Sequence, residues 1–292
     1  MLLYEQIQKN KRKTVLIVFV FILFLLAVGA AFSYINSGEP FSGMIITVII
    51  AAIYVTIVLS SSTSMVMRMN HAKEIKSVEE NRFLWHTVEN MAMVARIPMP
   101  RVFIVNDPSP NAFATGISPK NGAVAVTTGL MNELNREEME GVIAHEVAHI
   151  KNYDVRLSTI ALALVSVIAI ISDLGMRMMF FSRGGRNNKQ SPVILIIALV
   201  LVILAPIIAM MINMAISRNR EYLADASAAD LTRNPNALAT ALEKITGVST
   251  PVREASGSSA PLYFADPLKK KMSGLMSTHP DPQERIRRLR EM

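Results

Sequence analysis

Two histidines and a glutamate stand close together in the sequence His145-Glu146-Val147-Ala148-His149. Residues four positions apart share one face of a helix, so both imidazoles can reach the same metal ion. Glu146 lies beside them, where its carboxylate can take the proton of a metal-activated water as that water attacks a carbonyl group. The motif therefore predicts a hydrolytic zinc centre with His145 and His149 as ligands and Glu146 as general base.

A third ligand is needed, because a catalytic zinc has three protein ligands and one open position. By chance, the motif alone occurs in about one protein in a hundred of this length. Cysteine is absent from the sequence, so the remaining ligand must be His, Asp or Glu. Glu221 and Asp225 are again four positions apart, and such a pair can give one carboxylate to the metal and one to the far nitrogen of a ligating histidine. The alternative for this segment is a charged helix face exposed to solvent.

The motif is one of several landmarks in the sequence. They are Asn111 to Ala114, Thr127 to Leu130, His145 to His149, Arg220 to Asp225, and His279 with Pro280. In this order, and among four hydrophobic blocks, they resemble the M48 family of membrane zinc metalloproteases, most closely its bacterial HtpX type. One departure is Asp281, because many relatives have a second proline directly after the first.

The resemblance implies a role for each matching residue. One Zn²⁺ per protein molecule is expected to be bound by His145, His149 and Glu221, with Glu146 as general base and Asp225 supporting a ligand. The implied fold is an α+β zincin-like (gluzincin) protease domain joined to membrane helices. The implied activity is the hydrolysis of peptide bonds in damaged or misfolded membrane proteins, as part of quality control and the stress response.

Further residues are candidates for contact with substrate. His279 lies just before a helix start and could donate a hydrogen bond to the oxyanion, with a structural turn histidine as the alternative. Residues 123–128 are expected to form an edge strand, in which Val124 and Val126 bind an extended substrate backbone. An ordinary sheet strand is the alternative. Asn111 is expected to help hold the same substrate.

The composition, 51% hydrophobic and 18% charged, is unusual for a soluble domain, and the apolar residues fall into four long blocks without charge. This pattern predicts an α-helical membrane protein with about four hydrophobic helices. Residues 1–67 are expected to form a transmembrane hairpin with spans at about 15–35 and 43–65. A cleaved signal peptide is the alternative for the first span. Basic residues flank both outer ends, which the positive-inside rule places in the cytoplasm.

A second hydrophobic hairpin is expected over residues 157–217. Its first block, Leu157 to Ser172, has 16 uncharged residues. At 1.5 Å per residue such a helix covers about 24 Å of a ~30 Å hydrocarbon core. The connecting loop is basic, which conflicts with a position outside the cell. We therefore expect a tilted or incompletely spanning hairpin.

The two remaining parts, 68–156 and 218–292, are expected to form one cytosolic protease domain. Asn135, with Glu138 three residues later, predicts a capping box that opens a helix through Lys151. Asp154 is expected to order the junction between this helix and the membrane rather than to bind metal. Other helices are expected over 81–96 and 235–247 and after Asp281, and a strand over 100–106.

The competing hypothesis is a non-proteolytic membrane scaffold or transporter-like pseudoenzyme with a structural zinc. Structural zinc sites are usually closed by four protein ligands, whereas this sequence offers three ligands and a general base. The net charge of +7 could suggest nucleic acid, but the basic residues are dispersed beside apolar blocks. The expected partners are protein or peptide substrates and the lipid bilayer, without nucleic acid and with the oligomeric state left open. The expected location is the bacterial plasma membrane, in a multi-pass arrangement with the active site facing the cytoplasm.

Overall fold

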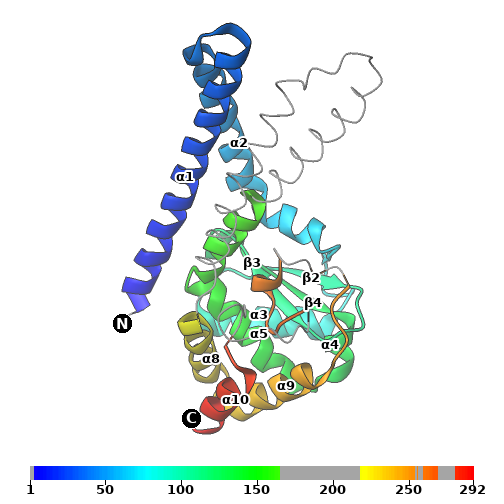
Figure 1. The fold of residues 1–292 in the computed structure, drawn as a ribbon. Helices are drawn as coiled ribbons and strands as arrows, with labels where there is room; N and C mark the ends of the chain where they lie inside the picture. The colour runs from blue at the N-terminus through cyan, green and yellow to red at the C-terminus, as the bar shows by residue number, and fades with distance from the viewer. Residues whose placement is uncertain (1–2, 165–217, 254, 256–258, 269–279) are drawn as a thin grey trace.

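A computed structural model describes residues 3–164, 218–253, 255, 259–268 and 280–292 (Figure 1). Two long helices, α1 (Leu3–Ser37) and α2 (Pro40–Met69), form a hairpin that projects from an α/β part of the protein. The hairpin turns at Gly38, whose φ of 74° lies in the left-handed region that favours glycine. Its two helices correspond to the hairpin predicted over residues 1–67.

The helices of the hairpin approach each other closely through small residues. A Cβ atom on Gly29 would overlap Thr47, and one on Gly43 would overlap the backbone of Gly29. Close packing of this kind, through glycine and hydroxyl residues, is typical of helix pairs in membranes. The Ser33 hydroxyl adds a hydrogen bond to the Glu39 carbonyl at 2.6 Å.

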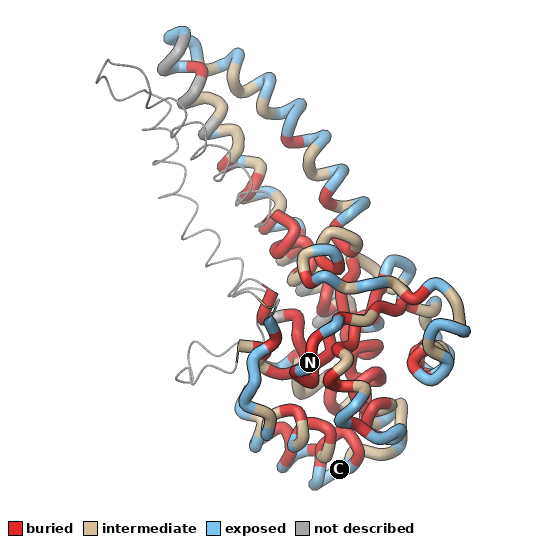
Figure 2. Tube along the Cα trace, turned by 90° about the vertical axis from the view of Figure 1, so that its right-hand side faces the viewer, coloured by how far each residue is buried: buried red, intermediate tan, exposed pale blue. Residues whose placement is uncertain are grey.

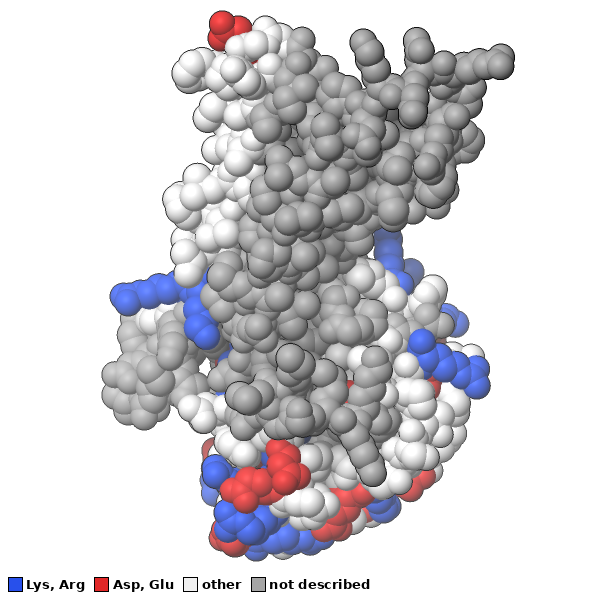
Figure 3. Space-filling model, viewed as in Figure 1, with Lys and Arg blue, Asp and Glu red and all other residues white. Residues whose placement is uncertain are grey.

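Among the described helices, α2 alone is long and apolar enough to cross a membrane, with 30 residues and a mean hydropathy of 2.5 in its most apolar window. Figure 2 shows exposed positions along both helices of the hairpin, whereas buried positions dominate the α/β part. In Figure 3 the described surface of the hairpin is almost free of charge, and Lys and Arg gather lower down. The expected second hairpin falls mainly on residues 165–217, outside the described part. Of the roughly four membrane helices predicted, α2 is therefore the one that the described residues support.

A four-stranded sheet forms the centre of the α/β part. It contains β1 (Lys73–Ile75), β2 (Arg101–Val105), β3 (Ala112–Thr115) and β4 (Ala123–Thr127) in the order β1-β2-β4-β3. Strands β2 and β4 are parallel, and the outer pairs β1/β2 and β3/β4 are antiparallel. The edge strand next to β4 is therefore β3.

The prediction that residues 123–128 form an edge strand is wrong. Strand β4 is paired on both sides, and all five of its residues are buried. Val124 and Val126, predicted to bind substrate, are each 1% exposed and belong to the hydrophobic core between the sheet and the helices. A strand of β-branched and small apolar residues buried on both faces is typical of the interior of a sheet.

Helices cover one face of this sheet. The core on this face joins the sheet to α3 (Arg82–Ala95), α5 (Arg136–Lys151) and α9 (Pro235–Gly247). Further helices in the described residues are α4 (Thr128–Glu133), α8 (Arg218–Thr232) and α10 (Pro282–Arg290). On the opposite face, the end of α2 packs with Val252, Leu262 and Tyr263 against Phe103, Phe113 and their neighbours.

Several sequence signals form the expected local structure. Asn135 accepts a hydrogen bond from the Glu138 N–H at 2.9 Å, and the Glu138 carboxylate accepts one from the Asn135 N–H at 2.9 Å. The predicted capping box is therefore confirmed. Asn81, Asn234 and Asp281 likewise accept hydrogen bonds from the first turns of α3, α9 and α10, which confirms those three helix starts.

Candidate metal centre

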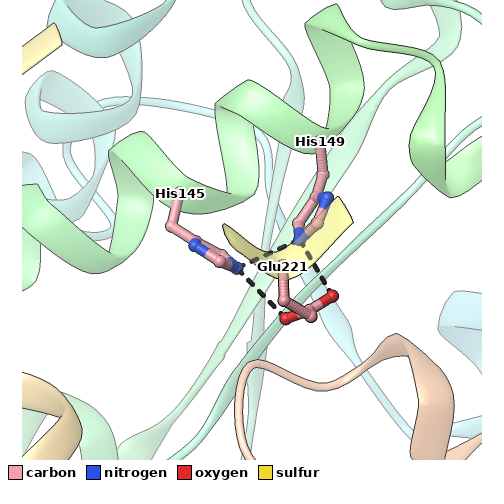
Figure 4. A group of neighbouring side chains, drawn as sticks. All are labelled: His145, His149 and Glu221. Atoms are coloured by element: carbon pink, nitrogen blue, oxygen red, sulfur yellow. Dashed lines mark hydrogen bonds and ion pairs between the residues drawn. The ribbon is translucent and has the colours of Figure 1, made fainter. Parts of the chain in front are cut away.

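The candidate ligand side chains meet where α5 crosses α8. His145 and His149 project from one face of α5 toward Glu221 of α8 (Figure 4). The two Nε2 atoms are 3.0 Å apart, and the Glu221 carboxylate oxygens lie 3.7 Å from His145 Nε2 and 3.6 Å from His149 Nε2. One potential ligand atom from each residue lies within 4.8 Å of the others, so the three can hold a metal ion.

The donor set fits zinc. Two imidazoles and one carboxylate are a common ligand set for catalytic zinc, with bonds of about 2.0 to 2.2 Å. Tetrahedral coordination at that length separates ligand atoms by about 3.3 Å. The observed separations of 3.0 to 3.7 Å bracket this value.

The position of α5 in the core fixes these side chains. His145 is 0% and His149 9% exposed, and the helix packs between the sheet and the helices α8 and α9. Gly141 allows this close packing, because a Cβ there would come within 3.2 Å of the backbone of Leu238 in α9. The two imidazoles therefore have little freedom to leave the site.

His145 is supported by Asp225, which lies one helical turn after Glu221. Asp225 Oδ1 is 2.9 Å from His145 Nδ1, the nitrogen that faces away from the other ligands. This contact is within ion-pair distance, although its geometry is not that of a full hydrogen bond. It agrees with the expectation that Asp225 supports a ligand. A carboxylate in this position fixes the tautomer and the orientation of a ligating imidazole.

Arg285 of α10 completes this arrangement, although no sequence motif had pointed to it. Its Nε and Nη2 atoms donate to the two Asp225 oxygens at 2.8 and 2.7 Å, and its Nη1 donates to the Phe264 carbonyl at 3.0 Å. Nη1 also lies 3.6 Å from a Glu221 oxygen. Burial would raise the pKa of Asp225, but the Arg285 guanidinium outweighs it and lowers that pKa to about 2.

His149 has its own carboxylate. Asp154 Oδ2 lies 3.3 Å from His149 Nδ1, so Asp154 faces the far nitrogen of this imidazole as Asp225 faces that of His145. The prediction that Asp154 orders the junction to the membrane overlooked this contact. Arg220 adds a hydrogen bond from Nη1 to the Asp154 backbone carbonyl at 3.2 Å.

Glu146 lies in a buried part of the site. It is 1% exposed, and its Oε1 atom has no hydrogen-bond partner among the residues that the structure describes. Burial raises the pKa of Glu146 to about 8, while the charges of His149 and Arg285 and the backbone N–H of Ala114 act in the opposite direction. A buried carboxyl oxygen without a partner is the feature expected of a general base that awaits a water molecule.

Burial would by itself lower the pKa of His145, but the carboxylates of Asp225 and Glu221 raise it overall. A bound metal ion requires this imidazole to be neutral, so metal and proton compete for the same nitrogen.

Two other residues were predicted to contact the substrate, Asn111 and His279. Asn111 is 0% exposed, and its side-chain amide bonds to the backbone of Ala265 in both directions, at 2.9 and 3.2 Å. It therefore binds another segment of the protein in this structure rather than being open to a substrate. His279 lies outside the described residues, so its predicted role stays a prediction.

Peptidase family M48 matches residues 79–292. A protease HtpX homolog of Listeria monocytogenes is 57% identical to this protein over 304 residues, with 100% of both sequences covered. One of Limosilactobacillus reuteri is 49% identical over 299 residues, with the same coverage. The crystal structure of S. mikatae Ste24p has a TM-score of 0.50 at 19% identity, and the match covers 98% of this protein and 67% of that one, which shows a similarity of fold.

The fold and the site together define a metallopeptidase. A His-His-Glu group is contributed by two packed helices beside a small sheet, and a buried glutamate lies next to it. The protein belongs to peptidase family M48, and within it to the HtpX type. It is therefore a membrane metalloprotease that acts on peptides or proteins, and the scaffold hypothesis is not favoured.

Proposed function

We propose that this protease uses one zinc ion held by His145, His149 and Glu221, with Glu146 as general base. The observation that carries the proposal is the convergence of three ligand atoms within 4.8 Å beside a buried glutamate oxygen that has no described partner. The absence of cysteine leaves nitrogen and oxygen donors, which suit a catalytic rather than a structural zinc. The domain is of the gluzincin type, because the third ligand is a glutamate.

Each residue has a defined task in peptide hydrolysis. When bound, zinc lowers the pKa of a water toward ~7 and polarises the scissile carbonyl group. Glu146 Oε1 accepts the proton of the attacking water, and Glu146 then gives it to the leaving amine. Asp225 and Asp154 hold the two imidazoles in the orientation that directs their Nε2 atoms toward the metal.

The proposed substrates are damaged or misfolded membrane proteins, which would be cleaved on the cytoplasmic side of the bacterial plasma membrane. The membrane location is supported by the distribution of exposed apolar side chains. Most of the large apolar side chains that are exposed in the described structure lie on α1 and α2, including Phe19 at 55%, Ile45 at 63% and Ile53 at 58%. Residues 157–164, the described start of the expected second hairpin, pack against α1 and α2. A multi-pass arrangement would therefore hold the metal centre close to the membrane surface.

A single substitution tests the chemistry. Glu146→Gln is expected to retain zinc, because the side chain is not a ligand, and to lose about 10²- to 10⁴-fold in turnover because the base is gone. Cleavage of casein by the purified protein in mild detergent measures the turnover, and metal analysis measures the zinc content. Zinc removal by a chelator should abolish cleavage by the wild-type protein. Near wild-type cleavage by the zinc-loaded Glu146→Gln protein would refute the assignment.

Cysteine labelling tests the orientation. The protein has no native cysteine, so an introduced cysteine shows on which side of the membrane its position lies. Suitable positions are Ser37, which is exposed at the end of α1, and Ser227 in α8. In intact cells an impermeant thiol reagent should react at position 37 and not at position 227. Efficient labelling at position 227 would contradict a cytoplasmic metal centre.

A further inference from the structure

The outer edge of β3 is already paired in this structure, and its partner is a distant segment of the same protein. Phe113 and Tyr263 form an antiparallel bridge, and the Phe264 N–H donates to the Ala112 carbonyl at 2.8 Å. We propose that residues 262–265, here called the internal strand, occupy the position of an extended substrate, so that the enzyme is autoinhibited until this strand leaves β3. The inference rests on the proposed function, because it assumes that substrate binds beside Glu146.

The internal strand lies directly over the metal centre. The Phe264 ring packs edge-on against the His145 imidazole, with 4.9 Å between the ring centroids. Ala114 follows Phe113 in β3, and its backbone N–H faces the Glu146 carboxylate. A peptide that pairs with this part of β3 must therefore pass the ligands and the base. One strand edge accepts one partner, so the internal strand and a substrate exclude each other.

The contacts that hold Phe264 and Ala265 would suit almost any peptide. Asn111 binds the backbone N–H and carbonyl of Ala265, and Arg285 binds the backbone carbonyl of Phe264. Because these side chains recognise backbone groups, an incoming extended peptide offers the same donors and acceptors. The exchange therefore leaves Asn111 and Arg285 with hydrogen-bond partners, which keeps this part of its free-energy cost small.

Side chains supply the part of the binding that is specific to the internal strand. The Tyr263 ring packs on Phe113 with 4.9 Å between centroids, and its hydroxyl donates to Asn70 Oδ1 at 3.0 Å. Asn70 is the residue that caps the C-terminal end of α2. Tyr263, Phe264 and Ala265 are between 1% and 4% exposed. The internal strand is thus fastened to the end of the membrane hairpin as well as to the sheet.

An internal competitor changes the kinetics in a characteristic way. The apparent affinity for substrate falls by the fraction of molecules in which the edge is open, so an edge that is open in about 1% of molecules raises KM about 100-fold. The turnover number of the substrate-bound enzyme is unaffected. Release of the strand should therefore lower KM and leave kcat unchanged.

A reversible disulfide tests the proposal within one protein. Phe113 and Tyr263 lie opposite each other, and their neighbours Ala112 and Phe264 make the hydrogen bond, so they are a non-hydrogen-bonded pair with Cα atoms about 4.5 Å apart in regular sheets. This separation suits a disulfide. The double variant Phe113→Cys/Tyr263→Cys should form it on oxidation, and no native cysteine competes.

The oxidised double variant is expected to lose at least tenfold in kcat/KM for casein with its zinc content unchanged, and a phosphine reductant should restore the activity. Equal cleavage before and after reduction, with the disulfide verified by mass spectrometry, would overturn the proposal. The two single-cysteine variants should not respond to oxidation. If neither the wild-type protein nor the reduced double variant cleaves casein with full zinc, the proposed function itself fails.

A second variant does not depend on the disulfide. Tyr263→Phe keeps the ring and removes the hydroxyl that bonds to Asn70. Loss of one such hydrogen bond should release the strand and lower KM about fivefold, with kcat unchanged. An unchanged or raised KM would contradict the proposal.

Discussion

His145 and His149, the two histidines of the candidate metal centre, stand four residues apart on one helix, yet the residues that support them differ. His145 is fully buried and faces Asp225, which comes from another helix and is itself held by two hydrogen bonds from Arg285. His149 is 9% exposed and faces Asp154, which follows it by five residues in the sequence. Asp154 Oδ2 lies 3.3 Å from His149 Nδ1. The support of His145 therefore depends on tertiary packing, whereas the support of His149 comes from a residue nearby in the sequence.

This difference indicates which half of the centre depends on the whole fold. Asp225 and Arg285 join α5, α8 and α10, so the orientation of His145 requires three helices to pack correctly. Asp154 keeps its place through the turn that ends α5 and through a hydrogen bond from Arg220 to its backbone carbonyl. Damage to the C-terminal helix should therefore reach the metal through His145 first.

The largest effect is expected from Arg285→Met. The substitution removes both donors to a carboxylate that is 2% exposed, and breaking a buried ion pair in this way costs about 3–5 kcal/mol of folding free energy. Denaturant titration of the full-length protein in detergent measures the loss. Arg285→Lys should recover only part of it, because an ammonium group cannot make the two parallel hydrogen bonds of the guanidinium.

Arg220→Met is the matched control. Arg220 is 8% exposed, but its observed hydrogen bond goes to a backbone carbonyl, so the expected loss is about 1.5–3 kcal/mol. A larger loss for Arg220→Met than for Arg285→Met would contradict the ranking of the two supports.

A smaller effect is expected from Asp225→Asn, and it should appear in metal affinity. Replacement of the carboxylate behind a ligating imidazole costs about 10- to 100-fold in affinity, and the buried position of Asp225 favours the upper end of that range. Competition with a zinc-binding dye measures the affinity. In the Arg285→Met background the same substitution should cost less, because the two residues act as a pair. Additive losses would show that Arg285 acts on the metal independently of Asp225.

Sequence signals found the local features of this centre. The motif on α5, its capping box and the pair Glu221 and Asp225 each depend on residues within one or two helical turns. Such features follow from helix periodicity and capping, which are visible in one segment.

Features that depend on distant pairing were missed. The assignment of residues 123–128 to an edge failed because strand order is set by contacts between segments. Strand β3 is short, and three of its four residues, Ala112 to Ala114, had been singled out only as part of a motif. Arg285 lies 60 residues from Asp225, yet a signal existed: it shares the buried face of α10 with Ile286 and Leu289, while the other arginines of the helix are exposed. A charged residue within an apolar stripe indicates a buried partner.

The smallest effect is expected from Asp154→Asn. Its contact with His149 Nδ1, at 3.3 Å, is the longer of the two carboxylate contacts, so the loss of zinc affinity should be near tenfold, the lower end of the usual range. The hydrogen bond from Arg220 goes to the backbone of Asp154 and survives the substitution, so the free energy of unfolding should change by less than the Arg285→Met loss of about 3–5 kcal/mol. The dye competition used for Asp225→Asn gives the direct comparison under the same conditions. If Asp154→Asn lost more zinc affinity than Asp225→Asn, the local support would be the stronger one, and the metal would depend more on the turn after α5 than on the C-terminal helix.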